Sequence, residues 1–289
     1  MWAECMSDLA ENRLSICNSL ETASVGLKHV ACDGACRRRS QTEYATETHL
    51  VYPYHGAFLR HVGSNDALGD AHRLLIFNEN QEYQISHPIS GGDECLSMMV
   101  DPAVLHEICP GDQLAKGSRA TFRHYSRRIG AHSQALVAFL VHGLRKQLVD
   151  ALEAEILALT LVRRSFEDDD PAPARSTIGR RKLAERAKLT LMEGLGRRWT
   201  LAEIAAEVGV SPVYLAQVFS QVEGVPLHRY HRQLRLARAL NLLPDCEDLT
   251  GLALDLGFSS HSHFTYAFRK QFGTSPSSFQ KSVDRARAA

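Results

Sequence analysis

The chain has 289 residues, of which 44% are hydrophobic and 23% charged, and its 33 Lys and Arg balance 33 Asp and Glu. This composition excludes a disordered chain, and the longest strongly apolar stretch, 135–144, contains His142 and is far shorter than the roughly 20 residues of a membrane-spanning helix. The first residues lack the basic and apolar segments of a secretion signal. We therefore expect a cytoplasmic protein without a membrane partner.

The balanced net charge conceals a difference between the two halves of the chain. Residues 175–289 contain 17 Lys and Arg and 10 Asp and Glu, a net charge of +7, whereas residues 1–174 contain 16 and 23, a net charge of −7. A basic half suits binding to a polyanion, and an acidic half is better explained as a separate sensing or assembly unit.

The first chemically distinctive segment contains Cys32 and Cys36, followed by three arginines at 37–39. Adjacent cations favour the thiolate, the form that binds soft metals, reacts with electrophiles or oxidises. Three alternatives stay open: a reduced pair in a solvated loop, a thiolate-bound metal ion or thiol-reactive sensor, and a catalytic thiol. For a metal site, the candidates that complete the ligand set are Cys95, His49, His55 and His87.

Residues 44–100 have the pattern of short strands separated by turns. Apolar, β-branched and aromatic residues gather at 50–54, 57–62, 73–77, 82–86 and 95–100, with turns rich in glycine and asparagine between them. This spacing predicts a small antiparallel barrel or sandwich.

The pattern becomes helical at 131–165, where leucine recurs every four residues on one stripe. The stripe must be buried, either against the barrel of its own chain or against a second subunit, and the sequence leaves both alternatives open. For a homodimer, the predicted dimerisation residues are Leu136, Leu140, Leu144, Leu148 and Leu152.

A run of acidic residues followed by two prolines predicts a solvated linker at 167–175. The predicted domains are therefore 1–166, for sensing and dimerisation, and 176–289. The second domain contains the same helix-turn-helix pattern twice, at 205–219 and 253–268, with equivalent core residues offset by 48 or 49 positions. In the first copy Thr200 begins a capping box, Gly209 permits the turn, and Ser211 caps the next helix.

A repeated helix-turn-helix with matched core positions predicts DNA binding. The core residues leave one face of each second helix outward, where Gln217 suits an adenine edge and the methyl group of Thr265 suits thymine. Arg269 is expected to contact the DNA backbone. The predicted DNA-binding residues are Val213, Ala216, Gln217, His261, Ser262, Thr265, Tyr266 and Arg269.

Residues 178–280 resemble the AraC/XylS family of bacterial transcription regulators, most specifically at 257–276. The resemblance implies seven helices, two reading modules joined by a long central helix, and recognition helices in successive major grooves of double-stranded promoter DNA. It also implies RNA polymerase as a partner and no enzymatic activity. Gln280 departs from the pattern, because the family commonly has arginine there, and one expected phosphate contact is therefore missing.

Residues 77–79 and 87–95 are similar to the cupin-type sensor barrel of some members, which implies an effector pocket inside the barrel. The usual cupin metal signature, two closely spaced histidines and a downstream glutamate, is absent, and this disfavours a cupin-type metal enzyme. The predicted fold is α+β: an N-terminal antiparallel β-barrel of cupin-like type with a helical dimerisation segment, then an all-α domain with two helix-turn-helix motifs.

The favoured hypothesis is a sequence-specific transcriptional regulator, such as an activator, controlled by a small-molecule, metal or thiol-reactive signal in the N-terminal domain. One alternative is a thiol alkyl acceptor coupled to DNA binding, similar to the Ada proteins. It is disfavoured because their four-cysteine arrangement needs more than Cys32 and Cys36. The other alternative is a constitutive DNA-binding protein without an effector.

Overall fold

The computed structural model describes residues 14–115, 120–167 and 176–285. The chain divides into two compact units, at 1–169 and 170–288. Apart from Glu167, the predicted linker at 167–175 lies outside the described residues. Among the helices described, none is long and apolar enough to cross a membrane.

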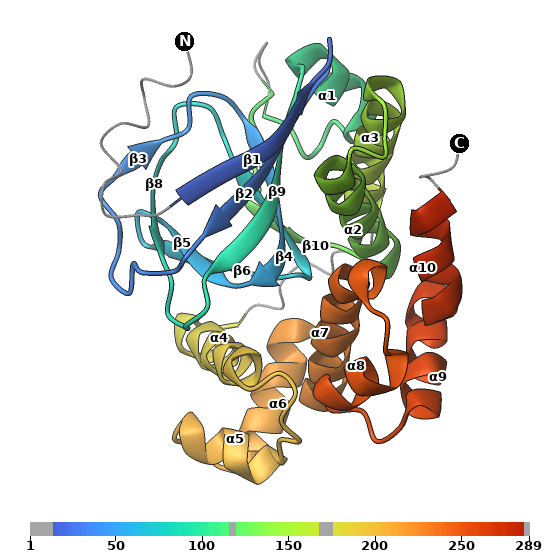
Figure 1. Cartoon of the computed structure of the whole chain (residues 1–289). Helices are drawn as coiled ribbons and strands as arrows, with labels where there is room; N and C mark the ends of the chain where they lie inside the picture. Colours follow the sequence, from blue (N-terminus) through green and yellow to red (C-terminus); the bar gives the residue numbers. More distant parts are fainter. Residues whose placement is uncertain (1–13, 116–119, 168–175, 286–289) are drawn as a thin grey trace. The chain divides into compact units, whose positions relative to one another are not determined.

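The N-terminal unit contains two antiparallel sheets and three helices (Figure 1). Its strands are β1 (Leu14–Glu21), β2 (Val25–Cys32), β3 (Glu43–Tyr44), β4 (His49–Gly56), β5 (Phe58–Val62), β6 (Asn65–Gly69), β7 (Arg73–Phe77), β8 (Glu82–Ser86), β9 (Asp93–Val100) and β10 (Ser126–Arg128). The larger sheet has the strand order β1-β2-β9-β4-β7-β10 and the smaller one β3-β8-β5-β6. The helices are α1 (Pro102–Ile108), α2 (Ala131–Lys146) and α3 (Ala151–Glu167).

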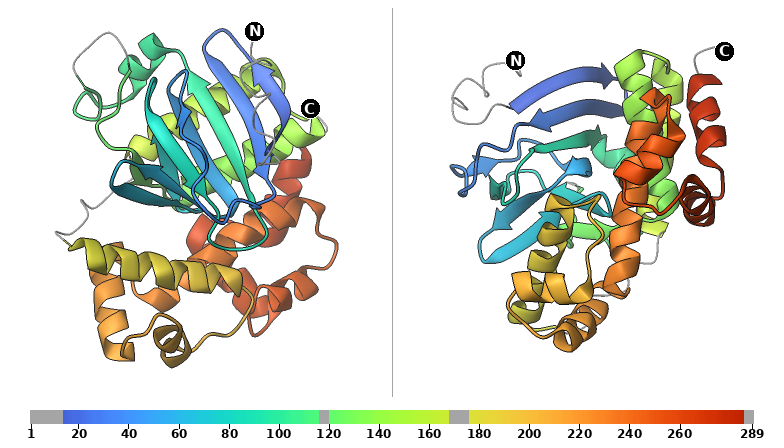
Figure 2. Two further views of the ribbon diagram at one scale, coloured as in Figure 1. Left: turned by 90° about the vertical axis from the view of Figure 1, so that its left-hand side faces the viewer. Right: turned by 60° about the horizontal axis from the view of Figure 1, so that its bottom comes forward.

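Side chains alternate between the two faces of the central strands, and this divides the apolar core of the unit into two clusters. On β7, Leu74 and Ile76 pack with residues of α2 and α3, whereas Leu75 and Phe77 pack with Phe58 of the smaller sheet. Successive side chains of a strand point to opposite faces of the sheet, so a strand that is buried on both faces contributes to both clusters. The helices α2 and α3 therefore cover one face of the larger sheet, and the smaller sheet covers the other (Figure 2).

The leucine stripe is divided between two helices, because Gln147 adopts a left-handed conformation (φ 55°) and ends α2. Leu140 and Leu144 are buried in the core of their own unit, and Leu136 is partly buried against it. The dimerisation prediction is wrong for Leu140 and Leu144, since side chains that fill their own core cannot also contact a partner. For Leu136, which is only partly buried, it stays a prediction.

The other two residues of the predicted dimerisation set lie elsewhere. Leu148 is in the turn between the helices and is half-buried. Leu152, on α3, is 67% exposed, and the neighbouring Ile156 is 56% exposed. An exposed apolar surface of this unit is therefore on α3, and not along the continuous stripe that the leucine spacing predicts.

The C-terminal unit is helical. Its elements are α4 (Ile178–Glu193), α5 (Leu201–Glu207), α6 (Pro212–Glu223), α7 (Leu227–Leu242), the short 3₁₀ helix η1 (Leu243–Asp245), α8 (Leu249–Asp255), α9 (His261–Phe272) and α10 (Pro276–Arg285). The pairs α5–α6 and α8–α9 form two helix-turn-helix modules, and α7 joins them (Figure 1). Among the described residues, seven α-helices follow the linker, as the family resemblance implies. The predicted α+β class is confirmed.

A buried ion pair lies in the core of the first module. The Nζ atom of Lys188 is 2.6 Å from Oε1 of Glu223, and the two side chains are only 2% and 3% exposed. The ammonium also lies 5.3 Å from the centre of the Tyr230 ring. The pair joins α4 to the end of α6 inside a cluster of apolar side chains, where an unpaired charge would be strongly destabilising.

Candidate nucleic-acid interface

In each module, a serine side chain caps the first turn of the second helix. The Ser211 side chain accepts a hydrogen bond from the backbone N–H of Tyr214, and Ser260 accepts one from His263. In the second module Gly257 has a φ of +78°, and a Cβ atom there would lie 2.3 Å from the carbonyl oxygen of Gly196. This turn therefore requires glycine for both its conformation and its packing.

On α6 the predicted reading residues lie on the exposed side. Val213 is 78% exposed, Gln217 is exposed, and Ala216 is half-buried. Tyr214, which the sequence reasoning did not select, is 43% exposed on the same helix. The opposite side fills the core, as the apolar pattern predicts, through Leu215, Val218 and Phe219.

On α9 the predicted residues differ in the exposure of their side chains. Tyr266 is 67% exposed, and Ser262 and Arg269 are also exposed. His261 and Thr265 are half-buried and face each other, with Nε2 of the histidine 3.5 Å from Oγ1 of the threonine. The exposed residues can therefore contact a ligand without rearrangement. His261 and Thr265 must first break the contact between their side chains.

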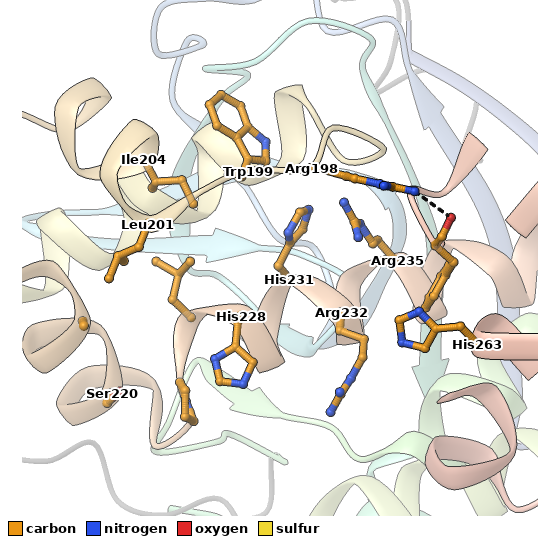
Figure 3. A pocket seen from close by; sticks show the side chains of 14 residues that line it. Arg198, Trp199, Leu201, Ile204, Ser220, His228, His231, Arg232, Arg235 and His263 are labelled. Atoms are coloured by element: carbon orange, nitrogen blue, oxygen red, sulfur yellow. Dashed lines mark hydrogen bonds between the residues drawn. The ribbon is translucent and has the colours of Figure 1, made fainter. Parts of the chain in front are cut away.

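A basic groove of about 400 Å³ lies between α6 and α9 (Figure 3). Ala216 and Ser220 line it from α6, and His263 lines it from α9. Figure 3 shows His228 and Arg232 directed away from Trp199, and His231 and Arg235 directed toward it. The described lining holds three arginines, three histidines and no carboxylate: Arg198, Arg232, Arg235, His228, His231 and His263.

The sequence reasoning missed the basic residues that α7 and the segment before α5 contribute to this groove, because it sought DNA contacts in and after the second helix of each module. The signal was the run of arginine and histidine at 228–235, where i, i+3 and i+4 spacings place His228, Arg232 and Arg235 close together along a helix. A concave, cationic surface between two outward helix faces suits a phosphodiester backbone that passes from one major groove to the next.

Arg235 connects the two modules. Its guanidinium donates to the carbonyl oxygens of Leu195 (2.8 Å), Arg197 (2.7 Å) and Gly257 (3.1 Å). The first two precede α5 in the first module, and the third lies in the turn of the second module. One side chain of α7 therefore connects the segment before α5 with the turn between α8 and α9.

His231 makes the stability of this unit depend on pH. Burial, together with the charge of Arg235, lowers the pKa of His231 to about 4, against about 6.5 in an unfolded chain. Below about pH 6.5 the unfolded chain takes up the proton first, so the stability present above this pH is lost progressively down to about pH 4. We expect a loss of about 2 kcal/mol between about pH 7 and pH 5 from this residue.

Urea unfolding of the full chain at these two pH values, followed by the helical circular-dichroism signal, measures the effect. The control is His231→Gln, which has no titratable ring but keeps an N–H donor for the carbonyl of Leu195 that His231 contacts at 3.0 Å. A pH dependence that is the same in this variant and in the native chain would assign the effect to other groups.

Gln280 has a structural role. Its side-chain Nε2 donates to the carbonyl oxygens of Leu243, at 2.9 Å, and of Cys246. The amide therefore ties α10 to the end of η1. It is engaged in these contacts in place of the phosphate contact that an arginine would make.

The structure brings only part of the predicted metal-ligand set together. Within the described residues, the side chains that gather are Cys32, His87 and Asp93, with their ligand atoms all within 4.8 Å of one another. Asp93 was not among the predicted ligands, and Cys95 contacts this group through a 3.1 Å hydrogen bond from its Sγ to Asp93 Oδ2.

The remaining predicted ligands lie outside this group. Cys36 contributes its backbone carbonyl, which accepts a hydrogen bond from the backbone N–H of His87, but its sulfur is not part of the group. His49 contacts Ser97, and His55 contacts Glu94 at 3.2 Å. The prediction of Cys36, His49 and His55 as ligands of one ion with Cys32 is therefore corrected.

Comparison with known proteins finds similarity to transcriptional regulators in the C-terminal unit. Residues 204–282 match the helix-turn-helix domain family, and the HTH-type transcriptional activator RhaR of Klebsiella pneumoniae is 34% identical over 134 residues, which are 46% of this chain and 45% of RhaR. Residues 204–282 therefore form a helix-turn-helix domain, similar to the domain of AraC-family transcriptional regulators.

Two other similarities cover different shares of this chain. The HTH-type transcriptional regulator GadX of Escherichia coli O157:H7 is 26% identical over 239 residues, which are 82% of this chain and 84% of GadX. A crystal structure of an AraC-type transcriptional regulator from Chromobacterium violaceum covers 37% of this chain and 96% of its own, with 28% identity and a TM-score of 0.35. The chain spans less than half of the length of RhaR.

Proposed function

We propose that this chain regulates transcription by binding promoter DNA through both modules, under the control of a signal sensed by the N-terminal unit. The basic groove between the exposed faces of α6 and α9 is the observation that carries the proposal. The base-reading residues would be Val213, Ala216 and Gln217 in the first module and His261, Ser262, Thr265 and Tyr266 in the second. Arg269 would contact the DNA backbone.

Three further features belong to the same proposal. A second copy of the chain would pack on α3, where Leu152 and Ile156 are exposed, because an apolar helix surface of this kind suits a symmetric partner. RNA polymerase would be a further partner at the promoter. The signal would be a small molecule, a metal ion or a thiol-reactive agent, and the domains at 1–166 and 176–289 would divide sensing from DNA binding.

The first experiment is selection of duplexes from a random-sequence pool by the full-length protein. We expect an enriched site with two conserved half-sites about 10 base pairs apart, because recognition helices that enter successive major grooves are separated by one turn of DNA. Recovery of sequences with no shared motif would overturn sequence-specific regulation and favour non-specific DNA binding.

The groove is tested on the selected duplex with two arginine variants of the same helix. Arg232 lines the groove, whereas Arg229 is exposed on α7 and is not part of the lining. We expect Arg232→Ala to weaken binding to all sequences and to reduce the slope of log affinity against log salt by about 1, while Arg229→Ala leaves the slope unchanged. Equal slopes for the two variants would place the DNA backbone outside the groove.

A further inference from the structure

The group of Cys32, His87 and Asp93 lies where three segments of the N-terminal unit meet. Cys32 ends β2, Asp93 begins β9, and these two residues are direct partners in the antiparallel register. His87 follows β8. The three residues are far apart in sequence, and strand pairing brings a sulfur, a nitrogen and an oxygen within 4.8 Å of one another.

Glycines hold the backbone around this group in close contact. A Cβ atom on Gly92 would lie 2.0 Å from the carbonyl oxygen of Cys32, and one on Gly34 would lie 2.7 Å from Cα of Gly92. Both glycines have positive φ values, +68° and +72°. The segments that carry Cys32 and Asp93 can therefore touch only because neither glycine has a side chain, and the group is positioned before any ligand binds.

The three side chains are polar but buried. Cys32 is 9% exposed, His87 is 2% exposed and Asp93 is 6% exposed. His87 has its Nε2 atom 2.6 Å from Oδ1 of Asp93, while its buried Nδ1 atom has no hydrogen-bond partner among the described residues. A buried nitrogen without a partner is costly. The short contact between Nε2 and Oδ1 brings the imidazole and the carboxylate close enough to share one ion with the sulfur of Cys32.

We propose that Cys32, His87 and Asp93 form a binding site for a divalent cation of the zinc type. Thiolate sulfur, imidazole nitrogen and carboxylate oxygen are the ligands that Zn²⁺ takes in proteins, usually four in a tetrahedron. A water molecule completes the four, next to the thiol of Cys95, which contacts Asp93. Binding replaces the thiol proton of Cys32, which leaves to solvent, by a bond from sulfur to the metal.

The bound ion would join β2, β8 and β9 at one point. Its use as the signal for transcription rests on the function proposed above, whereas its binding does not. Metal binding and DNA binding are therefore measured separately, the second with the selected duplex on chelator-treated protein before and after addition of Zn²⁺. Absence of DNA binding in both states contradicts the proposed function, and failure to bind metal contradicts the site.

Cobalt(II) reports the ligands of such a site directly, because thiolate coordination produces a charge-transfer absorption. The full-length protein, freed of metal by a chelator, is titrated with Co²⁺ and then with Zn²⁺. We expect one equivalent of Co²⁺ with thiolate absorption, displaced by Zn²⁺. Cys32→Ser should weaken binding by more than about 100-fold and remove this absorption, since loss of a ligand exceeds the effect of losing an outer contact.

The matched control is Cys36→Ser, which changes a nearby thiol outside the group and should bind Co²⁺ as the native chain does. In the native chain itself, Zn²⁺ should protect Cys32 from alkylation, mapped by mass spectrometry, and leave the reactivity of Cys36 unchanged. This second measurement needs no variant and so does not depend on how Cys32→Ser folds. Binding without thiolate absorption, equal losses in both variants, or equal reactivity of Cys32 with and without Zn²⁺ would each overturn the site.

Discussion

Replacing Glu223 with alanine is expected to destabilise the C-terminal unit by about 3 to 5 kcal/mol. The substitution leaves the ammonium of Lys188, which is 2% exposed, without its counter-charge inside the core of the first module. The nearby ring of Tyr230 offers only a weak electrostatic contact in its place. Urea unfolding of the full chain, followed by the helical circular-dichroism signal, measures the free energy of unfolding.

The double variant Lys188→Met, Glu223→Leu separates the cost of a broken pair from the contribution of the intact pair. Because apolar side chains of similar volume often replace a buried ion pair without loss, we expect it to recover most of the stability. The control is Arg197→Ala, which breaks an exposed pair with Glu203 in the same unit and should cost less than about 1 kcal/mol. If Glu223→Ala costs no more than Arg197→Ala, the pair is solvated and the argument fails.

The helix-turn-helix modules could be predicted because their signals are local. Ser211 and Gly209 lie within a few residues of the helix ends that they define, and the structure places them as expected. The strands at 73–77 and 82–86 were predicted with the same bounds as β7 and β8. In each case the residues that specify the element are neighbours in the sequence.

Elements without such local signals were missed. Among the described strands, the edge strand β1 pairs with β2 alone, and its apolar residues Leu14 and Ile16 are exposed. Its short alternation therefore does not mark a buried face. The break in the leucine stripe is at Gln147, a residue that rarely adopts a left-handed conformation and gives no warning of a turn. β6 lies between the predicted strands at 57–62 and 73–77, where the glycine and asparagine residues predicted only a turn.

The group of Cys32, His87 and Asp93 could be predicted only in part, because its members are distant in sequence. Cys36 was chosen for its closeness to Cys32 in sequence, whereas the register of β2 and β9 brings Asp93 directly opposite Cys32. Nothing near Asp93 in the sequence indicates this pairing, because it depends on which strands are neighbours in the sheet. His87 was among the candidates, and the structure brings it into the group.

Replacing Arg235 with methionine is expected to destabilise the C-terminal unit by about 3 kcal/mol, since hydrogen bonds from a charged donor contribute about 1.5 to 3 kcal/mol each and are not additive. Methionine keeps the apolar stem but donates to none of the carbonyls of Leu195, Arg197 and Gly257. Arg229→Met, on the exposed side of the same helix, is the matched control and should change stability by less than about 0.5 kcal/mol.

The same variant should also weaken binding to the selected duplex at temperatures where the unit stays folded. Without these hydrogen bonds, the turn at Gly257 is no longer connected to the turn at 195–197. The two recognition helices can then move independently, and their spacing no longer matches half-sites one helical turn apart. Binding to a duplex with one half-site should then change less than binding to the complete site. An equal loss on both duplexes would mean that Arg235 acts on DNA directly from the groove, and not through the spacing of the modules.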